Sequence, residues 1–254
     1  MTSHALRSIG VFRCAQRFPY ESPRQGVLAP PGEPGRVELD AGLEDAAADL
    51  VGFDRVWLVS FLDRAGGWRT RVRPPRHSDR KVGVLGTRSP HRPNPIGISA
   101  VRLLAVRGGV LEVAEFDLLD GTPILDVKPY LPWCDSFPDA ATGWVGEPGD
   151  ACRVEFTPAA AARAERVREA TELDPVRVAC VQLAHEPTDG ARKRVAPRDG
   201  GGWTFAYRTW RLDFEVEDGR VLVVDVRSGY SSEELADPAD PYGDKDVHRA
   251  FRAG

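Results

Sequence analysis

The spacing of hydrophobic and polar residues along this chain changes character near residue 157. Before that point, short apolar runs separated by turn residues predict strands at 6–14, 55–62, 68–72, 98–106, 110–119, 124–130 and 152–156. Arg107-Gly108-Gly109 is typical of a hairpin turn between two of them. Alanine-rich residues 41–50 favour a short helix. Short strands without alternating helices predict an antiparallel barrel or sandwich rather than a doubly wound sheet.

The later part of the chain mixes helices and strands. Thr157-Pro158 and Asp174-Pro175 each supply an N-cap followed by proline at the first helical position, which predicts helices over 159–173 and 175–184. Strands are expected at 203–216 and 221–226, around the turn Glu217-Asp218-Gly219. We therefore predict a mainly β chain of α+β class, with a domain at 1–156 and a smaller α+β domain at 157–254.

Residues 82–98 begin as a strand and become a stiff, polar loop. Pro90, Pro93 and Pro95 fix φ and remove backbone donors, so this loop fits neither a helix interior nor a central strand. It also carries Arg88 and Arg92. A rigid polar loop between two apolar runs favours a binding role, although a proline-braced turn with solvated charges has the same composition.

Composition and charge limit the class of protein. Of the 254 residues 42% are hydrophobic and 28% charged, which is ordinary for a globular protein, and no apolar run approaches membrane-spanning length. The polar first residues lack a signal-peptide core, so we expect a cytoplasmic protein. The net charge of −4 argues against a general nucleic-acid coat protein. Residues 69–92 are nevertheless rich in arginine and form a basic stripe. This stripe could hold a polyanion, or it could be an arginine-rich hairpin whose charges are simply solvated.

Several chemistries lack their usual patterns. The chain has no glycine-rich dinucleotide loop after a strand, no phosphate-binding Walker loop and no nucleophile elbow. The four cysteines stand far apart and the five histidines show no close ligand spacing, so we expect neither a disulfide framework nor a metal site.

Two motifs resemble those of a known family. Gly-Thr-Arg-Ser-Pro-His-Arg-Pro-Asn-Pro-Ile-Gly at 86–97 and Asp-Gly-Thr-Pro-Ile-Leu-Asp-Val-Lys-Pro-Tyr at 120–130 resemble the signatures of TrmO-like proteins. These methyltransferases use S-adenosylmethionine (SAM) to methylate N6 of threonylcarbamoyladenosine beside the tRNA anticodon. The resemblance is good over residues 7–156 and loose beyond. It implies a closed antiparallel barrel that binds SAM, a tRNA substrate and a homodimer.

The resemblance also implies the residues that hold the cofactor. They are Pro23, Arg24, Gln25, Leu62, Asp63, Arg88, Ile98, Asp120, Gly121, Thr122 and Pro123. Leu62 and Asp63 stand where the family usually has a polar pair beginning with histidine, so only a backbone contact is expected there. Without the resemblance, Ile98 would be ordinary core and Asp120-Gly121 an ordinary turn.

Methyl transfer from a sulfonium is an in-line displacement, in which the protein aligns donor and acceptor. The attacking nitrogen must also lose a proton, so an acceptor is expected nearby. Asp126 and Tyr130 are candidates by residue type, and Lys128 would hold a carboxylate or phosphate. All three would serve equally well as ordinary strand residues at a polar barrel end.

For tRNA we expect contacts from two basic groups. They consist of Arg69, Arg71, Arg73, Arg76 and Arg92 in the stripe, and Arg192, Lys193 and Arg194 in the last third. The family's Asp-Pro-Arg-Pro-x-Tyr segment corresponds to residues 186–191, which lack its arginine and tyrosine. We therefore expect the tail at 240–251, with Tyr242, His248 and Arg249, to supply charge and an aromatic ring. The alternatives are a SAM-binding RNA adaptor without turnover, or a methyltransferase for a small molecule or protein.

Overall fold

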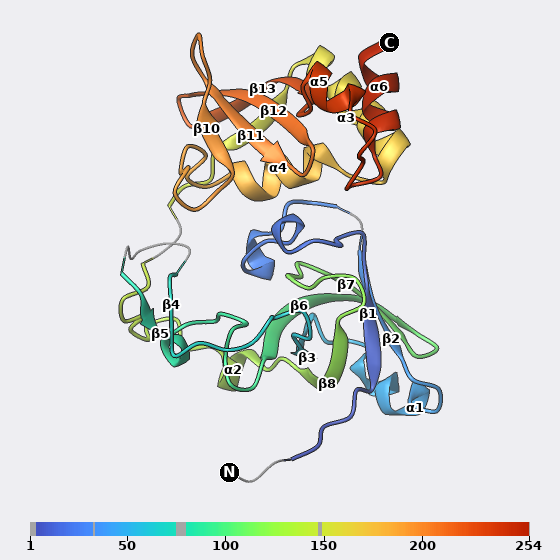
Figure 1. The fold of residues 1–254 in the computed structure, drawn as a ribbon. Coiled ribbons are helices and arrows are strands. Elements are labelled where there is room, and N and C mark those ends of the chain that lie inside the picture. Colours follow the sequence, from blue (N-terminus) through green and yellow to red (C-terminus); the bar gives the residue numbers. More distant parts are fainter. Residues whose placement is uncertain (1–3, 33, 75–79, 147–148, 254) are drawn as a thin grey trace. The chain divides into compact units, whose positions relative to one another are not determined.

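The computed structural model describes residues 4–32, 34–74, 80–146 and 149–253 (Figure 1). The chain divides into two compact units, unit 1 at Met1–Glu147 and unit 2 at Pro148–Gly254. Unit 1 contains a closed barrel and unit 2 a five-stranded sheet with helices. The predicted mainly β, α+β class is confirmed. The predicted boundary at 156–157 falls inside unit 2.

The barrel has six strands, and every neighbouring pair is antiparallel. In spatial order they are β1 (Gly10–Arg13), β2 (Gly35–Leu39), β7 (Val110–Ala114), β6 (Ile96–Arg107), β3 (Arg55–Phe61) and β8 (Pro123–Pro129). The closed antiparallel barrel expected from the sequence is confirmed. Strand β2, directly after a proline-rich loop, was not predicted.

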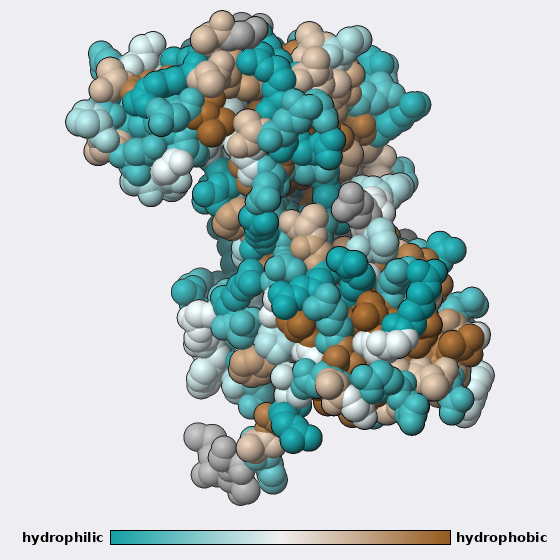
Figure 2. Space-filling model, turned by 90° about the vertical axis from the view of Figure 1, so that its right-hand side faces the viewer, coloured by the Kyte–Doolittle hydropathy of each residue, from teal (hydrophilic) through white to brown (hydrophobic). Residues whose placement is uncertain are grey.

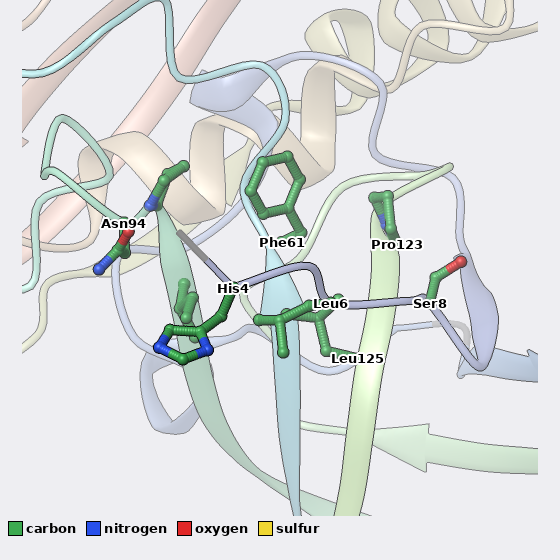
Figure 3. Close-up of a pocket in the computed structure, with 9 residues that line it drawn as sticks. His4, Leu6, Ser8, Phe61, Asn94, Pro123 and Leu125 are labelled. Carbon is green, nitrogen blue, oxygen red and sulfur yellow. The ribbon is translucent and has the colours of Figure 1, made fainter. Parts of the chain in front are cut away.

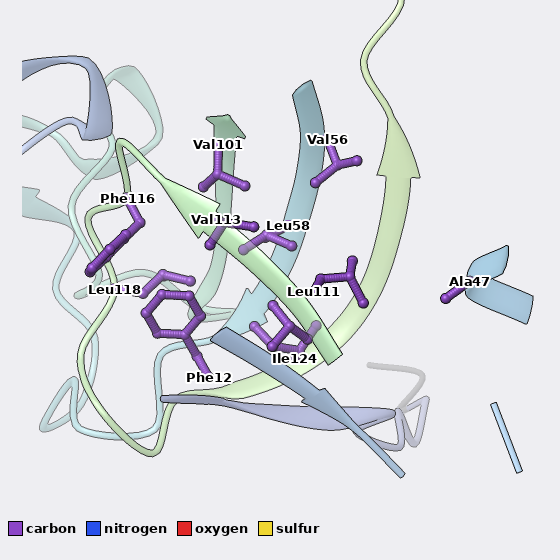
Figure 4. Close-up of a cluster of buried hydrophobic side chains, with 11 residues drawn as sticks. Phe12, Ala47, Val56, Leu58, Val101, Leu111, Val113, Phe116, Leu118 and Ile124 are labelled. Carbon is purple, nitrogen blue, oxygen red and sulfur yellow. The ribbon is translucent and has the colours of Figure 1, made fainter. Parts of the chain in front are cut away.

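The barrel interior is filled by alternate side chains from its strands. Val56 and Leu58 of β3 are fully buried, as are Val101, Leu111 and Ile124 on the facing strands (Figure 4). Phe116 and Leu118 follow β7 and close one end, with the Phe116 ring edge-on to Phe12 at 4.9 Å. Burying a side chain of this size contributes about 1.5–3 kcal/mol. The loop after β7 is therefore fixed by the core.

Two strands of unit 1 differ from expectation. The strand predicted at 68–72 is only β4 (Arg71–Val72), which pairs with β5 (Val82–Gly83) in a separate two-stranded ribbon. The strand predicted at 110–119 ends at Ala114, because Glu115 takes a left-handed φ of 57°.

Short helices complete unit 1. They are η1 (Pro19–Glu21), η2 (Gly26–Leu28), α1 (Glu44–Ala47), η3 (Ala48–Leu50), η4 (Val84–Gly86) and α2 (Pro132–Asp135). The predicted helical segment at 41–50 is confirmed by α1 and η3.

The unit 2 sheet has the order β10 (Val195–Pro197), β11 (Trp203–Tyr207), β12 (Trp210–Glu217), β13 (Arg220–Ser228) and β9 (Arg153–Phe156). Strand β9 runs parallel to β13, so its assignment as the last strand of the first domain was wrong. The single strand predicted at 203–216 was also wrong. Arg208, with φ of 52°, turns the chain between β11 and β12.

Both predicted helices of unit 2 are confirmed. Thr157 Oγ1 accepts from the Ala160 amide at 3.2 Å and caps α3 (Pro158–Thr171), while Asp174 Oδ1 accepts from the Arg177 amide at 2.8 Å and caps α4 (Pro175–Leu183). Two further helices, α5 (Ser232–Ala236) and α6 (Lys245–Ala253), were not predicted.

Candidate functional site

The motif residues meet at one mouth of the barrel. Because neighbouring strands are antiparallel, the ends of β1, β3 and β7 lie at the same mouth as the starts of β2, β6 and β8. The segments that begin or end at this mouth are 14–32, 62–70, 84–95 and 115–122. These loops hold most of the residues predicted to bind the cofactor.

Arg88 and Gln25 connect two of these loops. Arg88 Nη1 donates to Gln25 Oε1 at 2.5 Å, and Gln25 Nε2 donates to the Arg24 carbonyl at 2.6 Å. Pro23 is buried, whereas Arg24 and Arg88 are exposed. Gly26 fixes the approach of this loop, since a Cβ there would lie 2.0 Å from the Glu115 carbonyl oxygen. The structure therefore brings Gln25 and Arg88 together, although 63 residues separate them.

Asp117 adds a carboxyl group that the sequence analysis missed. Ser99 Oγ donates to Asp117 Oδ1 at 2.5 Å, and Asp117 lies between the buried Phe116 and Leu118. Burial raises the pKa of Asp117, while the Ser99 hydrogen bond and the charge of Arg88 act against that rise. A partly desolvated carboxyl beside Arg88 is a candidate proton acceptor.

The turn at 120–123 is held firmly to β1. The amides of Asp120 and Gly121 donate to the carbonyls of Gln16 and Phe12 at 2.7 and 2.8 Å, and Asp120 Oδ1 accepts from the Cys14 amide at 3.1 Å. Gly121 has φ of 79°, which favours glycine. Thr122 is buried, and its hydroxyl donates to the Leu119 carbonyl at 2.7 Å.

Arg64 is a second residue that the sequence analysis missed. Its Nη2 donates to the Asp120 carbonyl at 2.7 Å and its Nη1 to the Arg17 carbonyl at 3.0 Å. Arg64 therefore ties the turn at 120–123 to the segment that begins with Leu62 and Asp63. The Leu62 amide donates to the Pro95 carbonyl at 2.7 Å, so this segment also contacts the central loop.

A pocket of about 340 Å³ lies beside this mouth (Figure 3). Its lining combines the N-terminal segment with residues of β3, β6 and β8, namely His4, Leu6, Ser8, Phe61, Asn94, Pro95, Ile96, Pro123 and Leu125. Of the predicted cofactor residues, only Pro123 lines this pocket. Hydrophobic residues reach the surface in several places on the face drawn in Figure 2, and Phe61, Ile96 and Ile98 are among the exposed apolar side chains.

Two of the three proposed catalytic residues lie on the outer wall of β8. Val59 of β3 lies directly opposite Asp126 of β8 on one side and Ile98 of β6 on the other. Asp126 and Ile98 are therefore separated by two strand spacings, or about 9.6 Å across the sheet. Lys128 Nζ forms an ion pair of 2.8 Å with Asp126. Tyr130 follows the far end of β8 and packs against Trp57 with ring centroids 5.4 Å apart. A role in proton transfer stays a prediction for each.

The unit 1 arginines predicted to bind RNA lie on and near the β4–β5 ribbon. Arg69, Arg71 and Arg73 are exposed, and Arg71 Nη2 donates to the Lys81 carbonyl at 2.6 Å. Arg92 Nη1 donates to the Thr87 carbonyl at 3.2 Å, which braces the central loop. Arg76 lies outside the described residues.

In unit 2, Arg192 and Lys193 of the predicted basic triplet make contacts within the fold. Arg192 pairs with Asp189 at 2.9 Å, and both side chains are largely buried. Lys193 Nζ donates to the carbonyls of Gln182, His185 and Glu186, at and just after the last turn of α4. Both sets of contacts stabilise the fold, and Arg194 is exposed. RNA binding by the triplet stays a prediction.

The tail presents two of the three side chains expected to supply charge and an aromatic ring. Tyr242 and Arg249 are exposed, and Arg249 binds Asp246 and the Leu235 carbonyl. His248 is fully buried in α6, stacked on Trp210 at 3.9 Å. It therefore packs against the sheet and does not present its ring to an RNA.

Comparison with known proteins agrees with this arrangement. Residues 11–136 match the family described as the tRNA-methyltransferase O N-terminal domain. The tRNA (adenine(37)-N6)-methyltransferase of Escherichia coli is 34% identical over 231 residues, covering 85% of this chain and 93% of that enzyme. The chain belongs to the TrmO family.

Other TrmO family members give the same result. A Pseudomonas aeruginosa relative, provisionally named an S-adenosylmethionine-dependent methyltransferase, is 35% identical and covers 89% of this chain and 99% of its own. The crystal structure of TrmO from Pseudomonas aeruginosa matches this chain with a TM-score of 0.65 at 29% sequence identity. The match covers 89% of this chain and 98% of that structure. The TrmO similarity thus extends over both units.

Within the described ranges, no helix is long and apolar enough to cross a membrane. The same residues contain no group of three or more His, Cys, Asp or Glu side chains placed to bind a metal ion.

Proposed function

We propose that this protein is a SAM-dependent methyltransferase that methylates N6 of threonylcarbamoyladenosine next to the tRNA anticodon. The observation that carries the proposal is the match to the Escherichia coli tRNA (adenine(37)-N6)-methyltransferase over most of both chains. The contact between Arg88 and Gln25 supports it, because a residue of the 86–97 motif meets another of the implied cofactor residues at one barrel mouth.

The cofactor binds at this mouth in the proposed arrangement. Arg88 supplies a guanidinium for a carboxylate, by the bidentate geometry that arginine favours. The turn at 120–123 and the loop at 23–25 supply backbone groups for the polar edges of the cofactor. Ser22 and Ser60 have buried hydroxyls with no hydrogen-bond partner in the described part of the chain, which suits a site that a ligand completes.

The transfer itself is an in-line displacement. The attacking nitrogen forms a bond to the methyl carbon, the carbon–sulfur bond breaks with its electrons going to sulfur, and the nitrogen releases a proton. Asp117 is suited to receive that proton, because its carboxyl is partly desolvated and lies beside Arg88. Asp126, on the same outer row as Ile98, is the alternative acceptor.

The exposed arginines of the β4–β5 ribbon are proposed to contact the tRNA backbone, which supports an RNA substrate over a small molecule. We also propose a homodimer, as the resemblance implies, and a cytoplasmic location, as the polar first residues suggest. Light scattering of the purified protein tests the dimer.

The decisive experiment measures the reaction product. Purified protein, SAM and tRNA bearing threonylcarbamoyladenosine should yield the N6-methylated nucleoside, detected by mass spectrometry after digestion. Matched tRNA without the threonylcarbamoyl group should give none. If the modified tRNA binds but gains no methyl group, the alternative of a SAM-binding RNA adaptor takes its place.

A further inference from the structure

The outer face of the unit 2 sheet carries a row of arginines. Arg211 of β12 lies directly opposite Arg227 of β13 and also opposite Ala206 of β11. The Ala206 amide donates to the Arg194 carbonyl at 2.8 Å, which extends the ladder by one residue beyond β10. Opposed residues of an antiparallel ladder project from the same face, so Arg194, Ala206, Arg211 and Arg227 form one row across four strands.

This row points away from the hydrophobic side of the sheet. The alternate residues Tyr207, Trp210 and Leu212 are buried, and Trp210 packs against His248 and Phe251 of α6 at 3.9 and 4.8 Å. The side chains of Arg194 and Arg227 are exposed, and Arg211 is half-buried. The arginine row (Arg194, Arg211, Arg227) therefore lies on the face that α6 leaves uncovered.

The charge of Arg211 is not compensated by an ion pair among the described residues. Asp213 binds Arg227 at 2.8 and 3.2 Å, and Arg198 lies 3.8 Å from Asp213 and 3.7 Å from Glu215. Arg211 donates to the carbonyls of Arg208 and Trp210 at 3.2 and 2.8 Å, and it forms no ion pair with a carboxylate among the described residues. Like charges directly opposite one another destabilise a sheet.

Electrostatics agree with this geometry. Burial lowers the pKa of Arg211, and the charges of Arg227 and Arg194 lower it further, while Glu234 acts in the opposite direction. Glu234 itself accepts a hydrogen bond of 2.6 Å from the Ser231 amide as part of the α5 cap. An added anion would relieve the repulsion between these arginines.

The spacing indicates which anion fits. Neighbouring strands are about 4.8 Å apart, so the row spans three spacings or about 14 Å, longer than one phosphate group. Ala206, with its small side chain, stands between Arg194 and Arg211 in the row, and guanidinium groups suit phosphate oxygens.

We propose that the arginine row binds consecutive backbone phosphates of the RNA substrate. The inference rests on the proposed function, because it takes tRNA as the polyanion. Of the basic triplet expected to bind RNA, the proposal gives this role to Arg194. It adds Arg211 and Arg227, which belong to no recognised sequence motif.

The test is the salt dependence of tRNA binding by the full chain. In R194Q/R211Q, the slope of log Kd against log salt should fall by about 1.4–1.8, because two fewer phosphates are neutralised. Arg227 is kept, since its loss would leave Asp213 with a weaker partner. R194K/R211K should keep the wild-type slope, which separates lost charge from a misfolded sheet.

The matched control is R153Q/R220Q, which removes two arginines paired with Glu155 elsewhere on the same sheet. Its slope should equal that of the wild type. If R194Q/R211Q and the wild type have equal slopes and both methylate tRNA, the arginine row does not bind the RNA backbone. The proposed function would not be affected by that result. A wild-type protein that neither binds nor methylates tRNA would overturn both.

Discussion

At the scale of single residues, Asp117 is the proposed proton acceptor. Replacing it with asparagine keeps the shape and the Ser99 contact but removes the proton acceptor. We expect kcat for tRNA methylation to fall by about 10²–10⁴-fold, the usual contribution of a general base. Affinity for S-adenosylhomocysteine, measured by calorimetry, should stay near the wild-type value.

Asp126→Asn is the matched control, because Asp126 is a carboxylate on the same barrel whose contacts are an ion pair with the exposed Lys128 and a hydrogen bond from the Val127 amide. It should leave kcat nearly unchanged. The reverse result, a large loss with Asp126→Asn and none with Asp117→Asn, would reassign the proton acceptor to the outer row.

Arg88 is expected to contribute to cofactor affinity. Arg88→Ala removes a charged hydrogen-bond donor worth about 1.5–3 kcal/mol, so affinity for S-adenosylhomocysteine should fall about 10- to 100-fold. Arg107→Ala, at the hairpin between β6 and β7, should change nothing. Wild-type affinity in a folded Arg88 variant would remove it from the cofactor site.

The sequence predicted some of these residues and missed others for a physical reason. The resemblance to the TrmO family marks both Arg88 and Gln25 as cofactor residues, and the structure brings them into contact. Asp117 was missed because Phe116, Asp117 and Leu118 alternate as in a strand, and its partner Ser99 lies 18 residues away. Arg64 was missed because its partners are backbone carbonyls, which leave no pattern in the sequence.

At the scale of elements, the β4–β5 ribbon should act as an RNA contact. R69E/R73E reverses two exposed charges there, so tRNA binding should weaken and its salt dependence should flatten. R102E/R107E reverses two exposed charges on β6 and serves as the control. If both double variants bind tRNA as the wild type does, the ribbon arginines are only solvated.

Helix α6 should loosen as the pH falls. Thr209 donates to Asp244 at 2.7 Å, which leaves its oxygen to accept from His248 Nε2 at 3.0 Å, and a neutral His248 ring accepts at Nδ1 from the Ser228 hydroxyl 2.8 Å away. These contacts fit a neutral ring. Burial lowers the pKa of His248, aided by the charges of Arg252 and Arg211 and opposed by Asp244.

The unfolded state therefore binds a proton at a higher pH than the folded state does. Stability from this group is complete above the ordinary histidine pKa of about 6.5 and is lost as the pH falls below it. Thermal unfolding between pH 5 and 7.5 measures the effect. His248→Asn, which cannot titrate, should show a flatter profile, and parallel profiles would exclude His248 as the cause.

Element prediction succeeded where the local pattern was sufficient. The barrel strands and helices α3 and α4 have regular spacing and clear start residues. Strand β9 was misplaced because its partner β13 lies more than sixty residues later in the chain. Helix α6 was missed because it is held by tertiary contacts, above all His248 and Phe251 against Trp210.

At the scale of the whole molecule, the two units should separate in function. Every residue of the buried barrel cluster lies in unit 1, so a fragment of residues 1–147 contains its complete core. The predicted cofactor residues also lie there. We expect this fragment to fold and to bind S-adenosylhomocysteine with the affinity of the full chain, provided that the homodimer forms through unit 1.

The same fragment should bind tRNA weakly and methylate it slowly, because the arginine row belongs to unit 2. Circular dichroism checks the fold, calorimetry the cofactor and nucleoside mass spectrometry the product. A fragment of residues 148–254, added separately, serves as the control for unit 2 binding tRNA without cofactor. Methylation by residues 1–147 alone at the full-length rate would show that unit 2 takes no part in substrate recognition, whereas loss of cofactor binding in a folded fragment would place part of that site outside unit 1.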